Sequence, residues 1–150
     1  MGQQQLLLIV LGVIIVGIAI AVGISMFKSN AQSSNRDQVI NDLNNLAAKA
    51  QQYYRKPTSM AGGGQSFYLF GVGSGLSATD TVNANGSYYF GPDSTTAASG
   101  VRTQITTANE QNLYIYGVGT EAGNSASVAG GKVAAIVHVT QNGVTTSVVN

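Results

Sequence analysis

The sequence of 150 residues predicts an α+β fold, in which one long N-terminal α-helix packs on a small antiparallel β-sheet. Two observations lead to this prediction. The chain up to Pro57 has the pattern of a helix, with an apolar first half and an amphipathic second half. From Thr58 onward, short β-rich runs alternate with turn residues. We therefore expect three parts: residues 1–25, residues 26–57 and residues 58–150.

The first part is built around Leu6–Ile24, LLLIVLGVIIVGIAIAVGI, which contains only Leu, Ile, Val, Ala and Gly. A helix rises about 1.5 Å per residue, so this run is roughly 30 Å long, enough to cross the hydrocarbon core of a bilayer. A helix also satisfies its own backbone hydrogen bonds in lipid. Because this helix is apolar on every side, it must lie in lipid or be surrounded by other protein.

The second part continues the helix with a single apolar stripe. Its apolar residues recur at spacings of three and four, which is typical of one buried helix face. The residues expected to pack on the sheet are Val39, Ile40, Leu43, Leu46, Ala47, Ala50, Tyr53 and Tyr54. Arg55 and Lys56 favour the C-terminal end of a helix, and Pro57 disfavours its continuation. The whole helix is therefore about 50 residues and roughly 80 Å long.

The third part is expected to supply the strands. A flexible connector at 61–65 leads into it. The strand-like runs are 66–72, 87–90, 101–107 and 112–118, and polar loops at 73–85 and 119–131 separate them. Alternation in the fourth run places Leu113 and Ile115 on one face and Tyr114 and Tyr116 on the other.

The clearest strand signal is a C-terminal hairpin. Residues 132–140 and 144–149 are two β-rich runs that flank Gln141-Asn142-Gly143, and Asn-Gly between such runs is a strong hairpin signal. In the first run, alternate residues share one face: Val133, Ala135, Val137 and Val139. We expect this face to cover the apolar stripe of the helix, as in other two-layer folds.

Composition excludes several classes of function. The net charge is +1 and only 9% of the residues are charged, which gives no electrostatic basis for binding nucleic acid. The chain has no Cys, which excludes thiolate metal sites and Cys nucleophiles. The single His138 lies in a strand pattern without catalytic partners, and the carboxylates of the loops lack calcium-loop spacing. We therefore expect no enzyme activity, no cofactor and no metal.

The N-terminus departs from a removable secretory signal. No basic residue precedes the apolar run, and the first one, Lys28, follows it. Read by the positive-inside rule alone, this places the N-terminus outside. The alternative is that a basic leader has been removed and that Met1 is the first mature residue.

A long helix with a fully apolar first half, followed by a small antiparallel sheet, resembles a type IV pilin. With Met1 as the first mature residue, Gln5 falls where that family usually has Glu, and Leu6 onward matches the apolar helix of the filament core. The stretch NDLNNLAAKAQQYYRKPTSMAGGGQSF is similar to a helix-to-glycine-loop pattern in bacterial pilin-like proteins. If Met1 is instead the initiator, Gly2–Gln3 becomes the candidate cleavage junction and Leu7 takes the Glu position.

The resemblance implies a structural subunit that forms a helical homopolymer outside the cell. It implies a single span of the inner membrane before assembly, cleavage by prepilin peptidase with methylation of the new N-terminus, and dependence on pilus assembly machinery. The residues that it assigns to assembly are Met1, Gln5, Leu6, Leu7, Ile9, Val10, Val13, Ile14 and Ile18. Three features depart from the family: Gln5 is neutral, no Pro lies near position 22, and there is no C-terminal disulfide loop.

Two other functions stay open at this point. One is a pseudopilin of a type II secretion system, and the other is an unrelated binding domain with a single-span anchor. The role of the filament, in motility, adhesion or surface colonisation, is also open. Asn85-Gly86-Ser87 matches the N-glycan acceptor sequon, which makes Asn85 a candidate glycosylation site.

Overall fold

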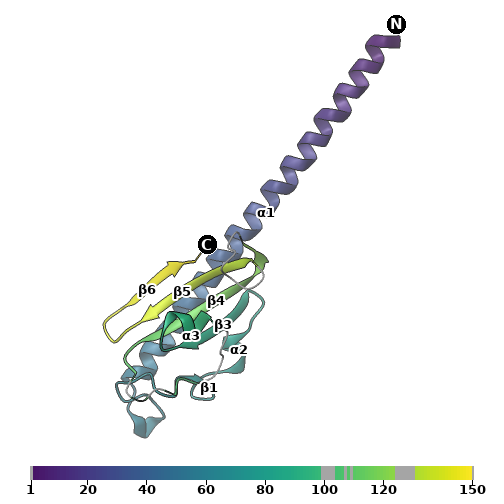
Figure 1. Ribbon diagram of the computed structural model, residues 1–150. Coiled ribbons are helices and arrows are strands. Elements are labelled where there is room, and N and C mark those ends of the chain that lie inside the picture. The colour runs from purple at the N-terminus through teal and green to yellow at the C-terminus, as the bar shows by residue number, and fades with distance from the viewer. Residues whose placement is uncertain (1, 99–103, 107, 109, 124–130, 150) are drawn as a thin grey trace.

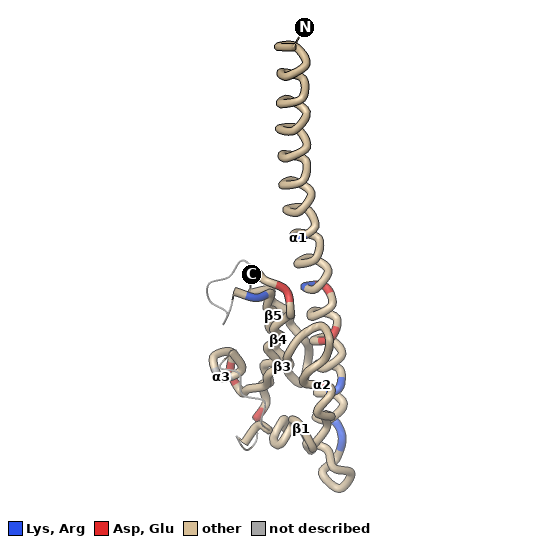
Figure 2. Tube along the Cα trace, turned by 90° about the vertical axis from the view of Figure 1, so that its right-hand side faces the viewer, with Lys and Arg blue, Asp and Glu red and all other residues tan. Residues whose placement is uncertain are grey.

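The computed structural model describes residues 2–98, 104–106, 108, 110–123 and 131–149, and the α+β fold is confirmed. Helix α1 (Gly2–Arg55) has its C-terminal half packed against a four-stranded antiparallel sheet (Figure 1). Its N-terminal half projects beyond the sheet, and no described segment lies beside it in either view (Figures 1 and 2). The chain thus combines a bare rod with a compact two-layer domain.

The segment that follows α1 supplies hydrogen-bond donors to the backbone carbonyls at the C-terminal end of this helix. A 3-10 helix at Thr58–Met60 begins directly after Pro57. The amide of Gly63 then donates to the Tyr53 carbonyl at 2.8 Å, and the amide of Gln65 donates to the Tyr54 carbonyl at 2.8 Å. These bonds satisfy carbonyls that a helix end leaves without partners. The expectation of a flexible connector is wrong here, because residues 61–65 form a hydrogen-bonded cap.

The sheet has the strand order β3-β4-β5-β6. Its strands are β3 (Gly86–Gly91), β4 (Leu113–Ala122), β5 (Lys132–Val139) and β6 (Val144–Val148), and neighbours are antiparallel. The predicted hairpin is confirmed, with Val139 paired to Val144. The Thr140 amide donates to the Gly143 carbonyl at 2.9 Å, and the Thr140 hydroxyl accepts from the Gly143 amide at 3.2 Å.

The core lies between α1 and one face of the sheet. The helix contributes its predicted stripe, in which Ile40 is partly buried and the other members are buried. The sheet contributes Leu113 and Ile115 of β4 and alternate residues of β5, namely Val133, Ala135, Val137 and Val139. Gly117 of β4 lets α1 approach closely, because a Cβ there would lie 2.9 Å from Val39 Cγ1.

The opposite face of the sheet carries a second, smaller cluster. Helix α3 (Ser94–Ala98) buries Ala97 beside Tyr116 and Ala134. Figure 1 shows this short helix on the side of the sheet away from α1. Helix α1 therefore covers the central strands β4 and β5 on one face, and α3 covers parts of β3 and β4 on the other.

The segment 66–72 is the largest error of the sequence prediction. Only Gly71–Val72 is strand (β1), and it pairs in parallel with β2 (Gly75–Leu76) rather than joining the sheet. Phe67 and Phe70 are fully buried, and Leu69 between them has a left-handed φ of 64°. Two buried rings three residues apart require a turn, because in a strand they would point to opposite faces.

Other loop predictions need smaller corrections. The expected loop 73–85 contains β2 and a short helix, α2 (Ala78–Thr81), which has a capping box between Ser77 and Asp80. In the predicted strand 101–107, residues 104–106 are not strand, and the remaining positions lie outside the described residues. The expected loop 119–131 begins too early, because β4 continues to Ala122. Residues 124–130 lie outside the description.

Candidate functional site

The candidate site is the part of α1 that the sheet does not cover, residues 2–27, which we call the bare half of α1. Every large hydrophobic residue from Leu6 to Phe27 is between 52% and 76% exposed. Residues 2–27 carry no charge, and this half of the helix is tan throughout in Figure 2. Isolated exposed apolar residues are ordinary on a protein surface, but a contiguous apolar surface of this length marks contact with a membrane or with protein.

The residues assigned to assembly all lie on this rod, except that Met1 is outside the described residues. Gln5 is exposed near the free end of α1, as are its apolar neighbours Leu6 and Leu7. The rod is apolar around its whole circumference, so these residues do not form one face. By length and composition α1 is the one candidate membrane span among the described residues.

The glycines of the rod add shallow notches to its surface. A Cβ at Gly12, Gly17 or Gly23 would meet nothing within 4 Å, apart from the helix's own neighbouring backbone. Small residues in apolar helices allow a second helix to approach closely. The notches therefore suit packing against other apolar helices as well as against lipid.

A collar of polar contacts marks where the bare half ends. Asn35 is buried, although it is polar. Its Nδ2 donates to the Asn85 carbonyl at 2.9 Å, and its Oδ1 accepts from the Glu121 amide at 3.3 Å. One turn earlier, the Gln32 side-chain nitrogen Nε2 donates to the Ala122 carbonyl. These contacts attach α1 to the ends of β3 and β4. The sequence did not predict them, because Gln32 and Asn35 stand in a polar stretch of the helix with no pattern that points to the sheet.

Asp42 forms a second attachment between α1 and the sheet. Its Oδ2 accepts hydrogen bonds from Asn83 Nδ2 at 2.8 Å, Asn85 Nδ2 at 2.8 Å and the Tyr88 hydroxyl at 2.7 Å. Partial burial opposes ionisation, but the bonds from Asn85, Tyr88 and Asn83 outweigh it and lower the pKa of Asp42. Burial and the neighbouring Asp42 carboxylate raise the pKa of Tyr88. The pair is therefore a phenol donating to a carboxylate.

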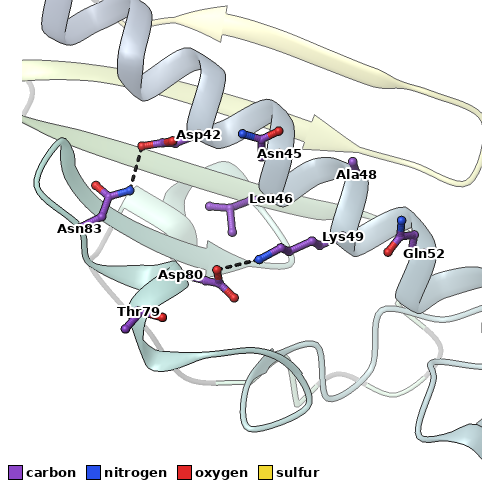
Figure 3. A pocket seen from close by; sticks show the side chains of 9 residues that line it. All are labelled: Asp42, Asn45, Leu46, Ala48, Lys49, Gln52, Thr79, Asp80 and Asn83. Carbon is purple, nitrogen blue, oxygen red and sulfur yellow. Dashed lines mark hydrogen bonds and ion pairs between the residues drawn. The ribbon is translucent and has the colours of Figure 1, made fainter.

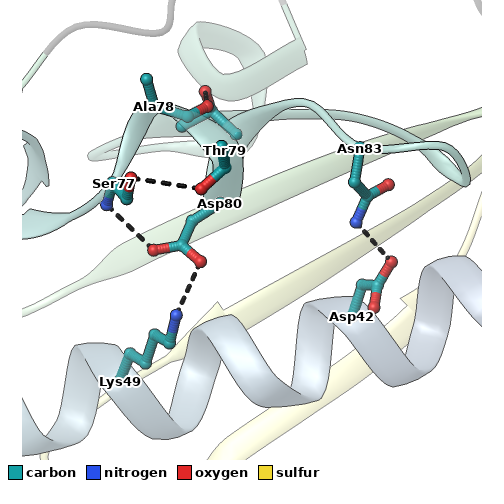
Figure 4. Close-up of polar contacts among 8 residues, drawn as sticks. Asp42, Lys49, Ser77, Ala78, Thr79, Asp80 and Asn83 are labelled. Atoms are coloured by element: carbon teal, nitrogen blue, oxygen red, sulfur yellow. Dashed lines mark hydrogen bonds and ion pairs between the residues drawn. The ribbon is translucent and has the colours of Figure 1, made fainter.

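An open polar pocket of about 470 Å³ lies between α1 and α2 (Figure 3). Lys49 Nζ lies 2.7 Å from Asp80 Oδ1 across it, and Asp80 Oδ2 accepts from the Ser77 amide at 2.9 Å (Figure 4). The bond from Lys49 lowers the pKa of Asp80. The residues that line the pocket are Asp42, Asn45, Leu46, Ala48, Lys49, Gln52, Thr79, Asp80 and Asn83. Lys49 pairs with Asp80, and Asp42 accepts from Asn83, so these contacts join α2 and the segment after it to α1.

Comparisons of the chain with family models, with curated proteins and with solved structures find no match. The architecture itself is a long apolar N-terminal helix with a small antiparallel sheet. It is compatible with a pilin-like fold.

Two further predicted residues have defined surroundings. The nitrogen of Asn85 to which a glycan would attach donates to Asp42, so glycosylation of the folded chain would disturb this contact. Its glycosylation stays a prediction. His138 is half-buried and stacks on Tyr114, with ring centroids 4.2 Å apart and planes 4° apart. Among the described residues, no group of three His, Cys, Asp or Glu side chains is placed to hold a metal ion.

Proposed function

We propose that this chain is a structural subunit that polymerises into an extracellular helical filament of the type IV pilus kind. The observation that supports this most is the division of α1 into two halves. Residues 35–54 bury one face against the chain's own sheet, whereas none of the described segments covers residues 2–27. Association through the bare half, rather than catalysis, is then the function of the molecule.

The bare half requires two successive environments in this proposal. Before assembly it spans the inner membrane, and after assembly it is buried among the same helices of other subunits. Lipid tails are about as apolar as Leu, so the exchange is nearly neutral in hydrophobic free energy. Assembly therefore depends on external machinery. Repetition of one head-to-tail contact that does not close on itself produces a helical filament.

Processing by a prepilin peptidase belongs to the same proposal, in the alignment that places Gln5 at the family's Glu position. Gln5 then takes the position at which the pilin family usually has Glu. A neutral amide can accept a hydrogen bond from the N-terminal amine of a neighbouring subunit, but it cannot form an ion pair. We therefore propose a hydrogen-bonded contact at Gln5 in place of a salt bridge.

Two alternatives differ from this proposal in what they assemble. A pseudopilin would form a short periplasmic filament of a type II secretion system, and an anchored binding domain would form none. The weakly charged sheet domain and its Gly-, Ser- and Thr-rich loops favour a filament sheath, because neighbouring subunits cover such surfaces. Whether the filament serves motility, adhesion or surface colonisation depends on partners outside this chain.

The decisive experiment is cryo-electron microscopy of filaments sheared from native cells, traced from the first ordered residue. We expect a core of α1 helices that begins at Met1, with the sheet domains outside it. Filaments confined to the periplasm would favour the pseudopilin. A chain that detergent extracts as a monomer, and that occurs in no filament, would overturn the proposal and leave α1 as an anchor.

A further inference from the structure

The outer edge of β6 is a second surface without a partner. β6 is the last strand of the sheet, and no described segment pairs with its outer side (Figure 1). The Val149 amide donates to the Ala134 carbonyl, and the Gly143 carbonyl accepts from Thr140, so the odd-numbered residues direct their backbone toward β5. By alternation, the backbone amides and carbonyls of Val144, Thr146 and Val148 point outward.

At the opposite edge of the sheet, the chain itself pairs with the beginning of the edge strand. The start of β3 is paired by an isolated bridge between Val82 and Ser87, and the Asn83 amide donates to the Gly86 carbonyl at 3.0 Å. The free edge of β6 lacks two common protections, since residues 140–149 contain no charge and no Pro. Val144 and Val148 are 40% and 46% exposed. An edge of this kind is a template for strand pairing.

The sequence of β6 points to the partner. Val144-Thr145-Thr146-Ser147-Val148 reads almost identically in both directions around Thr146. If two copies pair antiparallel about Thr146, Val144 lies opposite Val148 and Thr145 lies opposite Ser147. The parity also fits, because the residues that exchange hydrogen bonds in this register are Val144, Thr146 and Val148, whose backbones face outward.

We infer that β6 pairs antiparallel with β6 of a second copy of this chain, across a two-fold axis at Thr146. The two sheets then form one continuous sheet, and the β-branched side chains of both strands meet in cross-strand pairs. Helix α1 packs mainly on β4 and β5. It also meets β6 where the Thr146 hydroxyl donates to Asn44 Oδ1 at 3.3 Å, but this contact lies on the face of the sheet and leaves the outer backbone edge of β6 open. The interface is isologous, with the same strand contributed by each copy.

The symmetry of this contact sets its place in an assembly. A two-fold axis perpendicular to the sheet keeps both α1 helices on one face but points their bare halves in opposite directions. Two such copies cannot belong to one polar filament or to one membrane span with common orientation. If the proposed filament exists, on which this step rests, β6 joins two filaments that run antiparallel and so bundles them side by side.

The test uses a chain that has no native Cys. In Thr146→Cys, the two new thiols face each other across the axis, with Cα atoms about 5.5 Å apart, which suits a disulfide. In the control Thr145→Cys, the two thiols are about 8 Å apart on a diagonal, beyond bridging distance. Both positions are exposed. After oxidation with copper phenanthroline, we expect at least about tenfold more disulfide-linked dimer from Thr146→Cys.

The experiment is run on the detergent-solubilised full chain and on sheared filaments. Equal cross-linking of the two variants overturns the inference, even where filaments are seen. Preferential cross-linking in detergent without any filament supports the β6 contact and counts against the proposed function alone. In filaments we also expect Thr146→Lys, which places two cations opposite each other, to separate bundles that Thr145→Lys leaves intact. Bundles unchanged by Thr146→Lys would overturn the antiparallel joining of filaments.

Discussion

The Tyr88 hydroxyl donates a 2.7 Å hydrogen bond to Asp42 Oδ2, and this contact joins the packed C-terminal half of α1 to the first strand of the sheet. Tyr88 is fully buried, whereas Asp42 lies at the edge of the interface and also receives Asn83 and Asn85. A buried phenol needs an acceptor, and the carboxylate supplies a charged one. The contact therefore fixes where along the helix the sheet is seated.

Removal of the carboxylate should destabilise the sheet domain more than removal of the phenol. Asp42→Ala leaves the buried Tyr88 hydroxyl without its acceptor, and we expect a loss of about 2–3 kcal/mol in the free energy of unfolding. Tyr88→Phe leaves Asp42 with its two Asn donors and should cost about 1 kcal/mol. Urea unfolding in detergent, followed by tyrosine fluorescence, measures both. Additive losses in the double variant would contradict a direct interaction.

Stability should decrease in acid because of Asp42 and Asp80. Hydrogen bonds lower the pKa of both carboxyl groups in the folded chain below the ordinary value of 3.8. The unfolded chain therefore takes up protons first, so the stabilisation is complete above about pH 5 and is lost as the pH falls through the lower folded values. The urea midpoint should fall between pH 5 and pH 3, and it should fall less in Asp42→Asn. The same decrease in Asp42→Asn would exclude Asp42 as a source.

Gly117 should tolerate no large side chain. A Cβ at this position would lie 2.9 Å from Val39 Cγ1 and 3.1 Å from Leu43 Cδ1, so Gly117→Val forces α1 away from β4. We expect a loss of about 2 kcal/mol, measured by thermal unfolding of the full chain. The matched control is Gly143→Ala, because a Cβ there meets nothing within 4 Å and Gly143 is not in the left-handed region. Equal stability of both variants would mean that the helix–sheet contact is not tight.

A charge in the bare half of α1 should abolish assembly without unfolding the sheet domain. Ile14 is 52% exposed and is not part of the described hydrophobic core, so Ile14→Asp leaves that core unchanged. An aspartate at the centre of an apolar helix costs about 2.5–3.5 kcal/mol on membrane insertion. We expect no surface filaments by electron microscopy, whereas the control Ile14→Leu should form them. Normal filaments from Ile14→Asp would argue against burial of this position in a filament core.

The sequence predicted the fold where periodicity is strong. The stripe from Val39 to Tyr54 and the alternation from Val133 to Val139 each repeat often enough to identify an element and its buried face. The Asn-Gly pair correctly located the last hairpin, although the Thr140 side chain closes it and neither Asn142 nor Gly143 has a left-handed backbone. The local sequence pattern thus predicted the position of the hairpin, but it did not predict the backbone conformation of its turn.

The sequence failed where the decisive partner is distant. Residues 66–70 have strand composition, but their backbone turns so that Phe67 and Phe70 both enter the core, and the Phe67 amide donates to the Glu110 carbonyl. Asp42 and its donors are more than forty residues apart, so no local pattern relates them. The bare half of α1 could be predicted from composition alone, because its residues stay exposed and pack on no other described part of the chain.

The uninterrupted path of α1 has a mechanical consequence. A pull on the apolar end is carried without a hinge into residues 35–54, because no proline or kink separates the two halves. The helix lies along the sheet, so this tension acts as shear on the whole packed surface and on the contacts of Asn35, Asp42 and Lys49 together. Contacts strained together resist more force than contacts peeled apart one after another. The sheet domain is thereby anchored to withstand tension along the axis of its own helix.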